Sequence, residues 1–495
     1  MRCFLRKGGQ VCLWAIALFF VLLQGAYAEG GHYTGKPAKY VFLFIGDGMG
    51  VPQQVATEAF LGRKLLMSEF PGQGMTTTPA KDRFIVDSAA AATAISAGQI
   101  TNVGMIGMAP DSSHVKTVAE MAKERGMKVG IVSSVSIDHA TPAAFYAHVP
   151  KRSQYHYIDH AIAESGFDYF AGGGLKDPEG KRKGVESRGN ALDAITKAGF
   201  AIVNSRTAFN ALTPASGKVL AYNEWLQDSG AMPYAMDSRK GKDITLAEFT
   251  RKGIDLLDND KGFFMMVEGG KIDWACHAND AKAAIRDTEA FEQAVAEAVA
   301  FYRKHPEETA IIVTGDHECG GMTLGFAGTQ YDSHFNVLDA QSVSFQFFTD
   351  DVLGELLKSK KDSLTFADVQ PLITRYFGLR FSGDAAADPM VLKPYELAQL
   401  EAGFAMTMQV QAGKGGEEAE RLYSEYDPLT VSITHLVNNK AGLAWTSYSH
   451  TAVPVVTSAI GVGANSFNSS YHQSAIAMKI MALLGVQPQV QIASR

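Results

Sequence analysis

Cysteine is scarce in this sequence, since its 495 residues include only four. Cys3 and Cys12 lie in an apolar leader at the start of the chain, which leaves Cys276 and Cys319 for the rest. Two cysteines form one disulfide at most, and the sequence does not decide whether they pair. A small scaffold that depends on several disulfides is therefore excluded.

The sequence also lacks a Pro/Ser-rich linker, a repeat of fixed period and a long run of charges of one sign. Such features separate domains or mark disordered tails. A composition with 46% apolar and 20% charged residues is that of an ordinary globular protein. We expect one large domain over residues 29–495, with insertions.

The apolar run from Val11 to Leu23 has thirteen residues, too few to cross a bilayer comfortably, since a spanning helix takes about 20. It follows Arg2, Arg6 and Lys7 and precedes Ala26-Tyr27-Ala28, an A-x-A cleavage site. This pattern predicts a signal peptide over residues 1–28 and an exported protein, periplasmic or secreted, with no membrane segment after cleavage. The alternative is an uncleaved anchor.

Basic residues are fewer than acidic ones, and the formal net charge is −7. The predicted signal peptide contains three basic residues and no acidic one, so its removal changes the charge to −10. An acidic protein repels a polyphosphate backbone, so we do not expect nucleic acid as a partner.

Apolar runs bounded by glycine or charged residues recur along the chain, with segments of helical spacing between them. Runs that are apolar on both faces are typical of strands buried in a parallel sheet. The alternation predicts an α/β fold with a doubly wound, mostly parallel sheet flanked by helices. The predicted strands are Tyr40 to Ile45, Val129 to Val135, Phe263 to Val267, Ala310 to Thr314 and Val453 to Ile460. The predicted helices include Val115 to Arg125, Leu246 to Leu257, Ala281 to Tyr302 and Ser474 to Leu484.

The alternation is interrupted between about residues 380 and 440. This stretch contains a helical pattern from Tyr395 to Met408 and a glycine-rich loop near Gly413 to Gly416. We expect an insertion in the C-terminal half of the domain.

Polar side chains directly follow three of the predicted strands. Asp47 comes after the first, Glu268 after the third and the pair Asp316-His317 after the fourth. Because ligands of open α/β sheets bind beyond the carboxyl ends of the strands, these residues are candidates for one site. Asp273 and His277, four residues apart, would share one face of a helix. A single such aspartate more often caps a helix, but several at separate strand ends favour a metal site.

Ser88 is the candidate nucleophile. It precedes the alanine run Ala89 to Ala92, a strong helix former, so it should lie at a helix N-terminus, where free amides and the dipole favour an anion. The residues alone leave open a second interpretation, in which Ser88 is only the N-cap.

The segment from Ile85 to Thr93 resembles the active-site signature of alkaline phosphatases. Other pieces of that family's pattern occur in the family's order along nearly the whole mature chain. They are Asp47 among glycines, His139-Ala140-Thr141-Pro142, Val267-Glu268-Gly269-Gly270, Asp273 with His277, Gly315-Asp316-His317 and His450-Thr451. Six ordered matches are far more specific than any one of them.

The resemblance implies two zinc ions (Zn²⁺) and one magnesium ion (Mg²⁺). The ligands of the first zinc would be Asp273, His277 and His450, and those of the second Asp47, Asp316 and His317. The ligands of the magnesium would be Asp47, Thr141 and Glu268. Imidazole with carboxylate suits zinc, whereas hydroxyl and carboxylate oxygens suit magnesium.

Three further positions are assigned by the resemblance. Arg152 stands at the family's phosphate-binding arginine, where a guanidinium grips two phosphate oxygens; without the resemblance a surface arginine would be favoured. His139 stands where the best-known bacterial form has aspartate, so its imidazole could make the third site accept zinc. Trp274 replaces a lysine, which removes a cation from the phosphate site. Cys276 and Cys319 lie near predicted ligands, but buried small side chains are favoured over thiolate ligands.

The implied activity is hydrolysis of small phosphate monoesters through a phosphoserine at Ser88, with release of inorganic phosphate and a rate that rises into alkaline pH. One alternative is a phosphodiesterase of the same metalloenzyme class. Another is a binding protein that captures phosphate without turnover. The resemblance also suggests a homodimer.

Overall fold

The computed structural model describes residues 33–360 and 363–486. The predicted signal peptide, residues 1–28, lies outside the described residues. Among the residues that are described, no helix is both long and apolar enough to cross a membrane.

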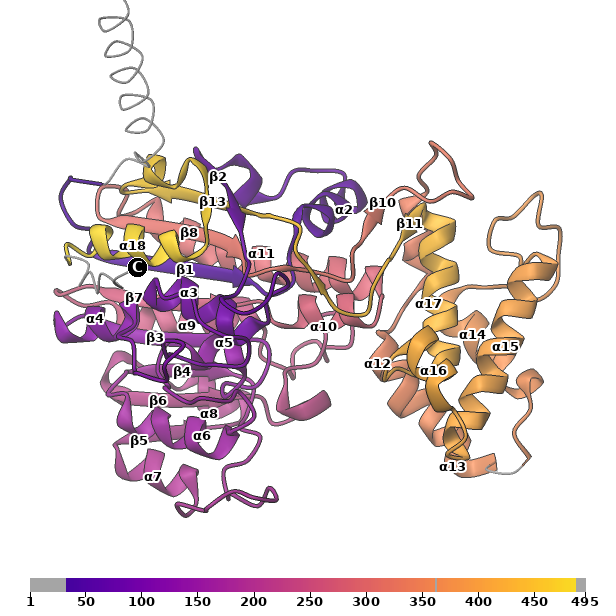
Figure 1. The fold of residues 1–495 in the computed structure, drawn as a ribbon, viewed down its shortest axis with the longest axis horizontal. Helices are drawn as coiled ribbons and strands as arrows, with labels where there is room; N and C mark the ends of the chain where they lie inside the picture. Colours follow the sequence, from indigo (N-terminus) through magenta and orange to yellow (C-terminus); the bar gives the residue numbers. More distant parts are fainter. Residues whose placement is uncertain (1–32, 361–362, 487–495) are drawn as a thin grey trace, which may run out of the picture.

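A ten-stranded sheet forms the centre of the fold (Figure 1). Its strands, in spatial order, are β14 (Ser469–His472), β2 (Gly72–Thr77), β13 (Val455–Gly461), β8 (Thr309–Gly315), β1 (Tyr40–Gly46), β7 (Phe263–Glu268), β3 (Lys128–Ser133), β4 (Tyr169–Gly172), β6 (Lys218–Tyr222) and β5 (Phe200–Val203). All pairings are parallel except those of β13, which is antiparallel to both β2 and β8.

The predicted strands correspond to β1, β3, β7, β8 and β13, and the mostly parallel α/β sheet is confirmed. The direction of β13 differs from the expectation of a parallel strand. Burial on both faces gives the same apolar run in either direction, so the sequence pattern could not distinguish the two.

Helices cover both faces of the sheet, because the side chains of each central strand alternate between two hydrophobic cores. In β1, Val41 and Leu43 face one core, and Phe42 and Phe44 face the other. The first core is covered by α3 (Ser88–Ala97), α4 (Val118–Glu124), α5 (Ala140–Ala143), α6 (Tyr155–Glu164), α7 (Ala191–Lys197) and α18 (Ser474–Leu483). The second is covered by α8 (Arg206–Asn210), α9 (Leu246–Leu257), α10 (Lys271–His277) and α11 (Ala281–Tyr302). The predicted helices correspond to α4, α9, α11 and α18.

A group of helices at one side of the molecule, which we call the helical lobe (residues 325–442), packs around a core of its own (Figure 1). It lies between β10 (Thr323–Leu324) and β11 (Leu443–Ala444), which pair antiparallel, and α2 (Val51–Leu61) contributes Ala56 to its core. Its helices are α12 (Phe345–Phe347), α13 (Gly354–Lys360), α14 (Phe366–Phe377), α15 (Pro394–Gln411), α16 (Gly416–Tyr423) and α17 (Pro428–Ala441).

The insertion expected at about residues 380 to 440 lies inside the helical lobe, which begins earlier in the chain. The segment before residue 380 contains α12, α13 and α14. Their helical spacing resembles that of helices that flank a sheet, so the pattern did not reveal that they pack around the same core as the later helices.

Replacing Phe42 by alanine should lower the free energy of unfolding by about 3–5 kcal/mol, because the ring is fully buried in the second core and its loss leaves a cavity. Urea unfolding measures the loss. Phe84→Ala is the matched control: its ring is 74% exposed, and the change should stay within about 0.5 kcal/mol. Similar losses in the two variants would contradict the placement of β1 at the centre of the sheet.

Candidate functional site

The carboxyl ends of β8, β1, β7 and β3 lie level with one another at one edge of the sheet. Ile45 is opposite both Thr314 and Glu268, and Ser133 is opposite Glu268. The residues at and after these strand ends therefore converge on one place, where open α/β sheets bind ligands.

The chain bends directly after β8 ends, and this bend lets adjacent Asp316 and His317 serve one site. In a continuing strand they would point to opposite faces. Asp316 Oδ1 accepts hydrogen bonds from the amides of His317 at 2.9 Å and Gly48 at 3.1 Å. Gly48 has a φ of +70°, and a Cβ there would lie 2.8 Å from the Cα of Asp273. The turn after β1 thus requires glycine.

The first of three clusters joins Asp273 and His277, one turn apart on α10, to His450, the first residue of β12 (His450–Thr451). His277 Nε2 lies 3.2 Å from Asp273 Oδ2 and 3.1 Å from His450 Nε2. The Nδ1 atoms of the two histidines lie 2.6 Å and 2.8 Å from the backbone oxygens of Tyr448 and Val86. A proton on each Nδ1 satisfies those carbonyls and leaves both Nε2 lone pairs directed at the same point.

The second cluster contains Asp47, Asp316 and His317, and it includes the candidate nucleophile. His317 Nε2 lies 3.4 Å from Asp47 Oδ1, 3.2 Å from Asp316 Oδ2 and 3.3 Å from Ser88 Oγ. All four residues are at most 1% exposed. The Ser88 hydroxyl and two carboxylates therefore all lie close to the same buried atom, His317 Nε2.

Asp47 also belongs to the third cluster, with His139 and Glu268. One nitrogen or carboxylate oxygen from each lies within 4.8 Å of the others. The Thr141 hydroxyl donates to Asp47 Oδ2 at 3.4 Å, and the Ser133 hydroxyl donates to Glu268. Ser133 was missed by the sequence reasoning. Its place at the end of β3, level with Glu268, is the signal that could have revealed it.

Ser88 is the first residue of α3, and Asp87 is the N-cap, accepting the Ala90 amide at 3.1 Å. The interpretation of Ser88 as a mere N-cap was therefore wrong. Arg152 donates through Nη1 to Asp87 Oδ2 at 3.0 Å and lies, through Nη2, 3.4 Å from His139 Nε2. Asp87, which the sequence reasoning also missed, thus connects the helix of the candidate nucleophile Ser88 to the candidate phosphate-binding arginine.

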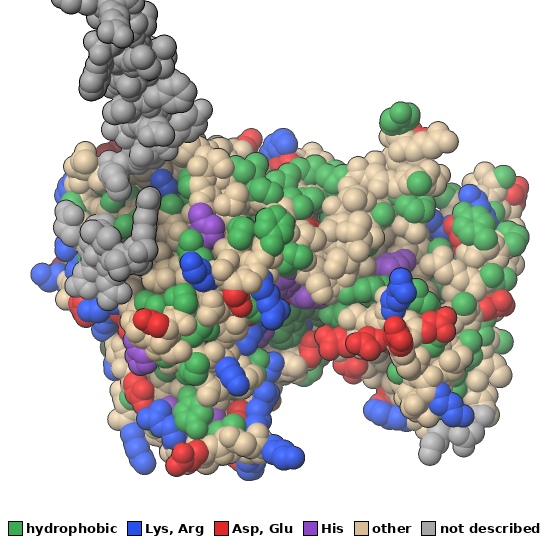
Figure 2. Space-filling view, in the orientation of Figure 1, with side chains coloured by type: hydrophobic (Ala, Val, Ile, Leu, Met, Phe, Trp, Pro, Cys, Tyr) green, Lys and Arg blue, Asp and Glu red, His purple; other side chains and the backbone are tan. Residues whose placement is uncertain are grey.

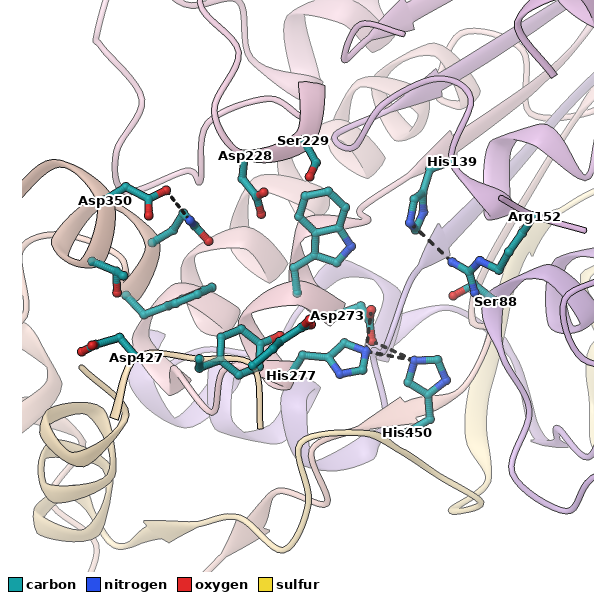
Figure 3. Close-up of a pocket in the computed structure, with 16 residues that line it drawn as sticks. Ser88, His139, Arg152, Asp228, Ser229, Asp273, His277, Asp350, Asp427 and His450 are labelled. Carbon is teal, nitrogen blue, oxygen red and sulfur yellow. Dashed lines mark hydrogen bonds and ion pairs between the residues drawn. The ribbon is translucent and has the colours of Figure 1, made fainter. Parts of the chain in front are cut away.

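Ser88 and Arg152 open on a cavity of about 630 Å³ between the sheet and the helical lobe (Figure 3). Trp274 forms part of its wall and lies edge-on to His139, with ring centroids 5.6 Å apart. The buried ammonium group of Lys271 lies 4.8 Å from the centre of the Trp274 ring. Burial lowers the pKa of Lys271 to about 8, so Lys271 places a cation close to the uncharged Trp274 only below that pH.

The family model of alkaline phosphatases matches residues 38–486. This chain belongs to the alkaline phosphatase family. It is 28% identical over 505 residues to alkaline phosphatase 3 of Bacillus subtilis (strain 168), and the match covers 98% of each chain. Membership makes the chain a metal-dependent hydrolase of phosphate monoesters.

Two solved structures are similar to this alkaline phosphatase. The cold-active alkaline phosphatase from the psychrophile Shewanella sp. gives a TM-score of 0.72 with 26% identity and covers 90% of this chain and 99% of its own. The second is a TAB5 alkaline phosphatase variant with a histidine replaced by glutamate and magnesium bound in the M3 site. It gives a TM-score of 0.62 with 27% identity, and the match covers 91% of this chain and 99% of the TAB5 chain.

The side chains at this site of the alkaline phosphatase fit cations. At this site, four buried carboxylate oxygens have no hydrogen-bond partner among the described residues, namely Asp47 Oδ1, Glu268 Oε1, Asp273 Oδ1 and Asp316 Oδ2. A buried charge without a partner costs several kcal/mol. Four such oxygens close together therefore require positive charge between them. Imidazole and carboxylate donors suit zinc, and the oxygen-rich third cluster suits magnesium.

Burial and mutual repulsion change the pKa values of these groups in the metal-free protein. Burial, followed by nearby carboxylates, raises the pKa of both Asp47 and Asp316 well above the usual range. Burial likewise raises the pKa of Glu268 to about 7. For His277 the effect of burial is outweighed by Asp273, and its pKa rises to about 9. The histidines in turn hold the pKa of Asp273 well below its usual value despite burial.

Cys276 and Cys319 are both free and fully buried, so they do not form a disulfide. Cys319 Sγ lies within 4.8 Å of donor atoms in the first cluster. It lies 3.7 Å from the backbone oxygen of Asp273. Burial raises the pKa of both thiols well above the usual value, which favours the neutral thiol.

Removal of the metal ions should make stability fall more steeply as pH rises from 6.5 to 8. Glu268 and His277 bind protons more tightly in the folded protein, so their stabilising contributions are lost as pH rises through folded pKa values of about 7 and about 9. Bound cations replace those protons, and each should add about 4 kcal/mol when the free ion exceeds its Kd about 1,000-fold.

Thermal unfolding of chelator-treated and of zinc- and magnesium-loaded protein across this pH range measures the difference. Burial lowers the pKa of His139 and His317 well below the usual value in the folded protein. Their titration in the unfolded chain is the same for the two forms, so it cancels in the comparison. Equal pH slopes for the two forms would contradict the assignment of the clusters as cation sites.

Proposed function

We propose that this chain is an exported alkaline phosphatase that hydrolyses phosphate monoesters through a phosphoserine at Ser88, with two zinc ions and one magnesium ion. The observation that carries the proposal is the position of Ser88. Its Oγ lies 3.3 Å from His317 Nε2, on the first turn of α3, and it faces the same cavity as Arg152.

The proposed metal ligands come from the three clusters and from Thr141, whose hydroxyl donates to Asp47. One zinc would be held by Asp273, His277 and His450, and the other by Asp47, Asp316 and His317. The magnesium would be held by Asp47, Thr141 and Glu268. When bound, the ions supply positive charge that lowers the pKa of the Ser88 hydroxyl and stabilises negative charge on the attacking and leaving oxygens.

His139 distinguishes the third site from a site made only of oxygen donors. The TAB5 variant with magnesium in its M3 site carries glutamate in place of a histidine. In this chain His139 adds a ring nitrogen beside Asp47 and Glu268. Nitrogen donors favour zinc relative to a set made only of oxygens, so zinc competes with magnesium there.

Arg152 and α3 bind the phosphate group in this proposal. Because Asp87 accepts the Ala90 amide, the amides of the first two helical residues remain for an anion. Asp87 also fixes the orientation of the Arg152 guanidinium. The planar guanidinium then presents its remaining N–H groups to two phosphate oxygens.

The reaction proceeds in two displacements at phosphorus. Ser88 Oγ loses its proton to solvent and forms a bond to phosphorus as the ester P–O bond breaks, and the alcohol leaves with a proton from solvent. Water then attacks the phosphoserine, the Ser88 O–P bond breaks, and inorganic phosphate leaves while Ser88 regains its proton. Arg152 and the α3 amides hold the phosphate oxygens through both steps.

The remaining parts of the proposal have the sequence as their support. The basic, apolar and A-x-A segments of residues 1–28 support export to a periplasm or to the medium. Resemblance to the family supports a homodimer.

Ser88→Ala should lower kcat for a chromogenic phosphate monoester by at least about 10³-fold, because the displacement loses its nucleophile. The native, metal-loaded enzyme should turn over faster as pH rises from about 6 into the alkaline range, since deprotonated oxygens are the reacting species. Acid quenching with labelled phosphate should trap the label on Ser88. Ser96→Ala, at the other serine of α3, is the matched control and should keep most of the activity.

A Ser88→Ala variant that retains more than a tenth of the native rate would overturn the phosphoserine mechanism. A native enzyme that hydrolyses a bis-ester faster than the corresponding monoester would instead favour the phosphodiesterase alternative.

A further inference from the structure

Charge is unevenly distributed in the catalytic cavity. Figure 3 shows Ser88 and Arg152 together at one end, and Asp350 and Asp427 at the opposite end. Asp228 and Glu425 also line the cavity, so four carboxylates besides that of Asp273 belong to its wall. Figure 2 shows acidic side chains gathered where the helical lobe faces the rest of the molecule. Among the described residues that line the cavity, Arg152 is the only Lys or Arg.

Two of the four carboxylates already accept side-chain or backbone hydrogen bonds, and two do not. Asp427 caps α17, accepting the Thr430 amide at 2.8 Å and the Thr407 hydroxyl at 2.8 Å. Asp350 accepts the Gln346 side-chain amide at 2.5 Å. Asp228 and Glu425, within the part of the chain that is described, form no ion pair or side-chain hydrogen bond. The two carry negative charge into the cavity.

Aromatic rings lie beside these carboxylates. Trp274, Phe345 and Tyr426 line the same cavity, and the rings of Phe345 and Tyr426 meet edge-to-face at 5.6 Å. Aromatic faces attract organic cations, and ammonium groups most of all when carboxylates are near. These rings distinguish the cavity wall from an ordinary solvated acidic surface.

The cavity is a ligand site on separate grounds as well. Asp273 and His139 line it, and Asp273 Oδ1 and His139 Nδ1 are buried without hydrogen-bond partners among the described residues. His139 Nε2 lies 3.4 Å from Arg152 Nη2, which places this end of the cavity on the phosphate side. The carboxylates and rings therefore face the part of a bound ester that leaves as the alcohol.

We propose that this cavity selects phosphate monoesters whose alcohol carries an ammonium group, of the kind represented by phosphocholine and phosphoethanolamine. The inference rests on the proposed function, because the phosphate must occupy the Ser88 end. Asp228 and Glu425 then attract the ammonium group, and Trp274, Phe345 and Tyr426 surround its carbon atoms. The ester bond is broken as in the general reaction, so no other reactant is needed.

The test compares two esters of the same shape. Phosphocholine and 3,3-dimethylbutyl phosphate differ in one atom, the nitrogen that carries the positive charge. The native, metal-loaded enzyme should show a kcat/KM about tenfold higher for phosphocholine at low ionic strength, the ratio that corresponds to 1.4 kcal/mol. Added salt should reduce this ratio because it screens the exposed carboxylates.

The readout for variants is the ratio of the two kcat/KM values, which does not depend on the amount of active enzyme. In the double variant Asp228→Asn, Glu425→Gln the ratio should fall to within about twofold of one, as expected when most of a 1.4 kcal/mol preference is lost. Glu401→Gln, an exposed glutamate on α15 that is not part of the cavity wall, is the matched control and should keep the native ratio.

A native ratio near one, or a double variant with the native ratio, would overturn the selection of cationic esters while leaving the phosphatase activity established. Failure of the metal-loaded enzyme to hydrolyse either ester would overturn the proposed function itself.

Discussion

Negative charge is concentrated at the carboxyl edge of the sheet, and the functional site depends on cations that neutralise it. Asp47, Glu268, Asp273 and Asp316 are buried together, and each has an oxygen without a hydrogen-bond partner in the described chain. Such a group repels itself unless cations lie within it. The level strand ends and the bend after β8 bring these oxygens together. The cost of assembling them in the absence of metal is the reason that they are poised to bind it.

The two parts of the fold contribute differently to the site. Ser88, Asp273 and His277 lie on helices that flank the sheet, and Asp47, Asp316 and His317 lie just after the ends of β1 and β8. Arg152 lies in a turn before α6. The helical lobe supplies the far wall of the cavity through Phe345 and Tyr426. Phosphate chemistry and recognition of the alcohol are thus separated in space. Changes in the lobe can alter substrate preference without moving the strand ends.

Much of this arrangement could be predicted from the sequence because strong local patterns marked it. Central strands buried on both faces are continuous apolar runs, and α9 and α11 were predicted with the bounds that the structure has. The direction of β13 and the start of the helical lobe were not predictable, since burial and helical spacing look alike in either context. Ser133 and Asp87 were missed because their roles come from partners distant in sequence, Glu268 and Arg152. The roles of the site residues rest on the family resemblance, which local spacing could only suggest.

The most direct test of the cation clusters is a crystal structure of zinc- and magnesium-loaded protein with anomalous scattering measured on both sides of the zinc absorption edge. Two zinc peaks are expected, one among Asp273, His277 and His450 and one among Asp47, Asp316 and His317. Density between Asp47, Thr141 and Glu268 should show a weaker zinc signal or none. Absence of zinc from the first two clusters would contradict the account.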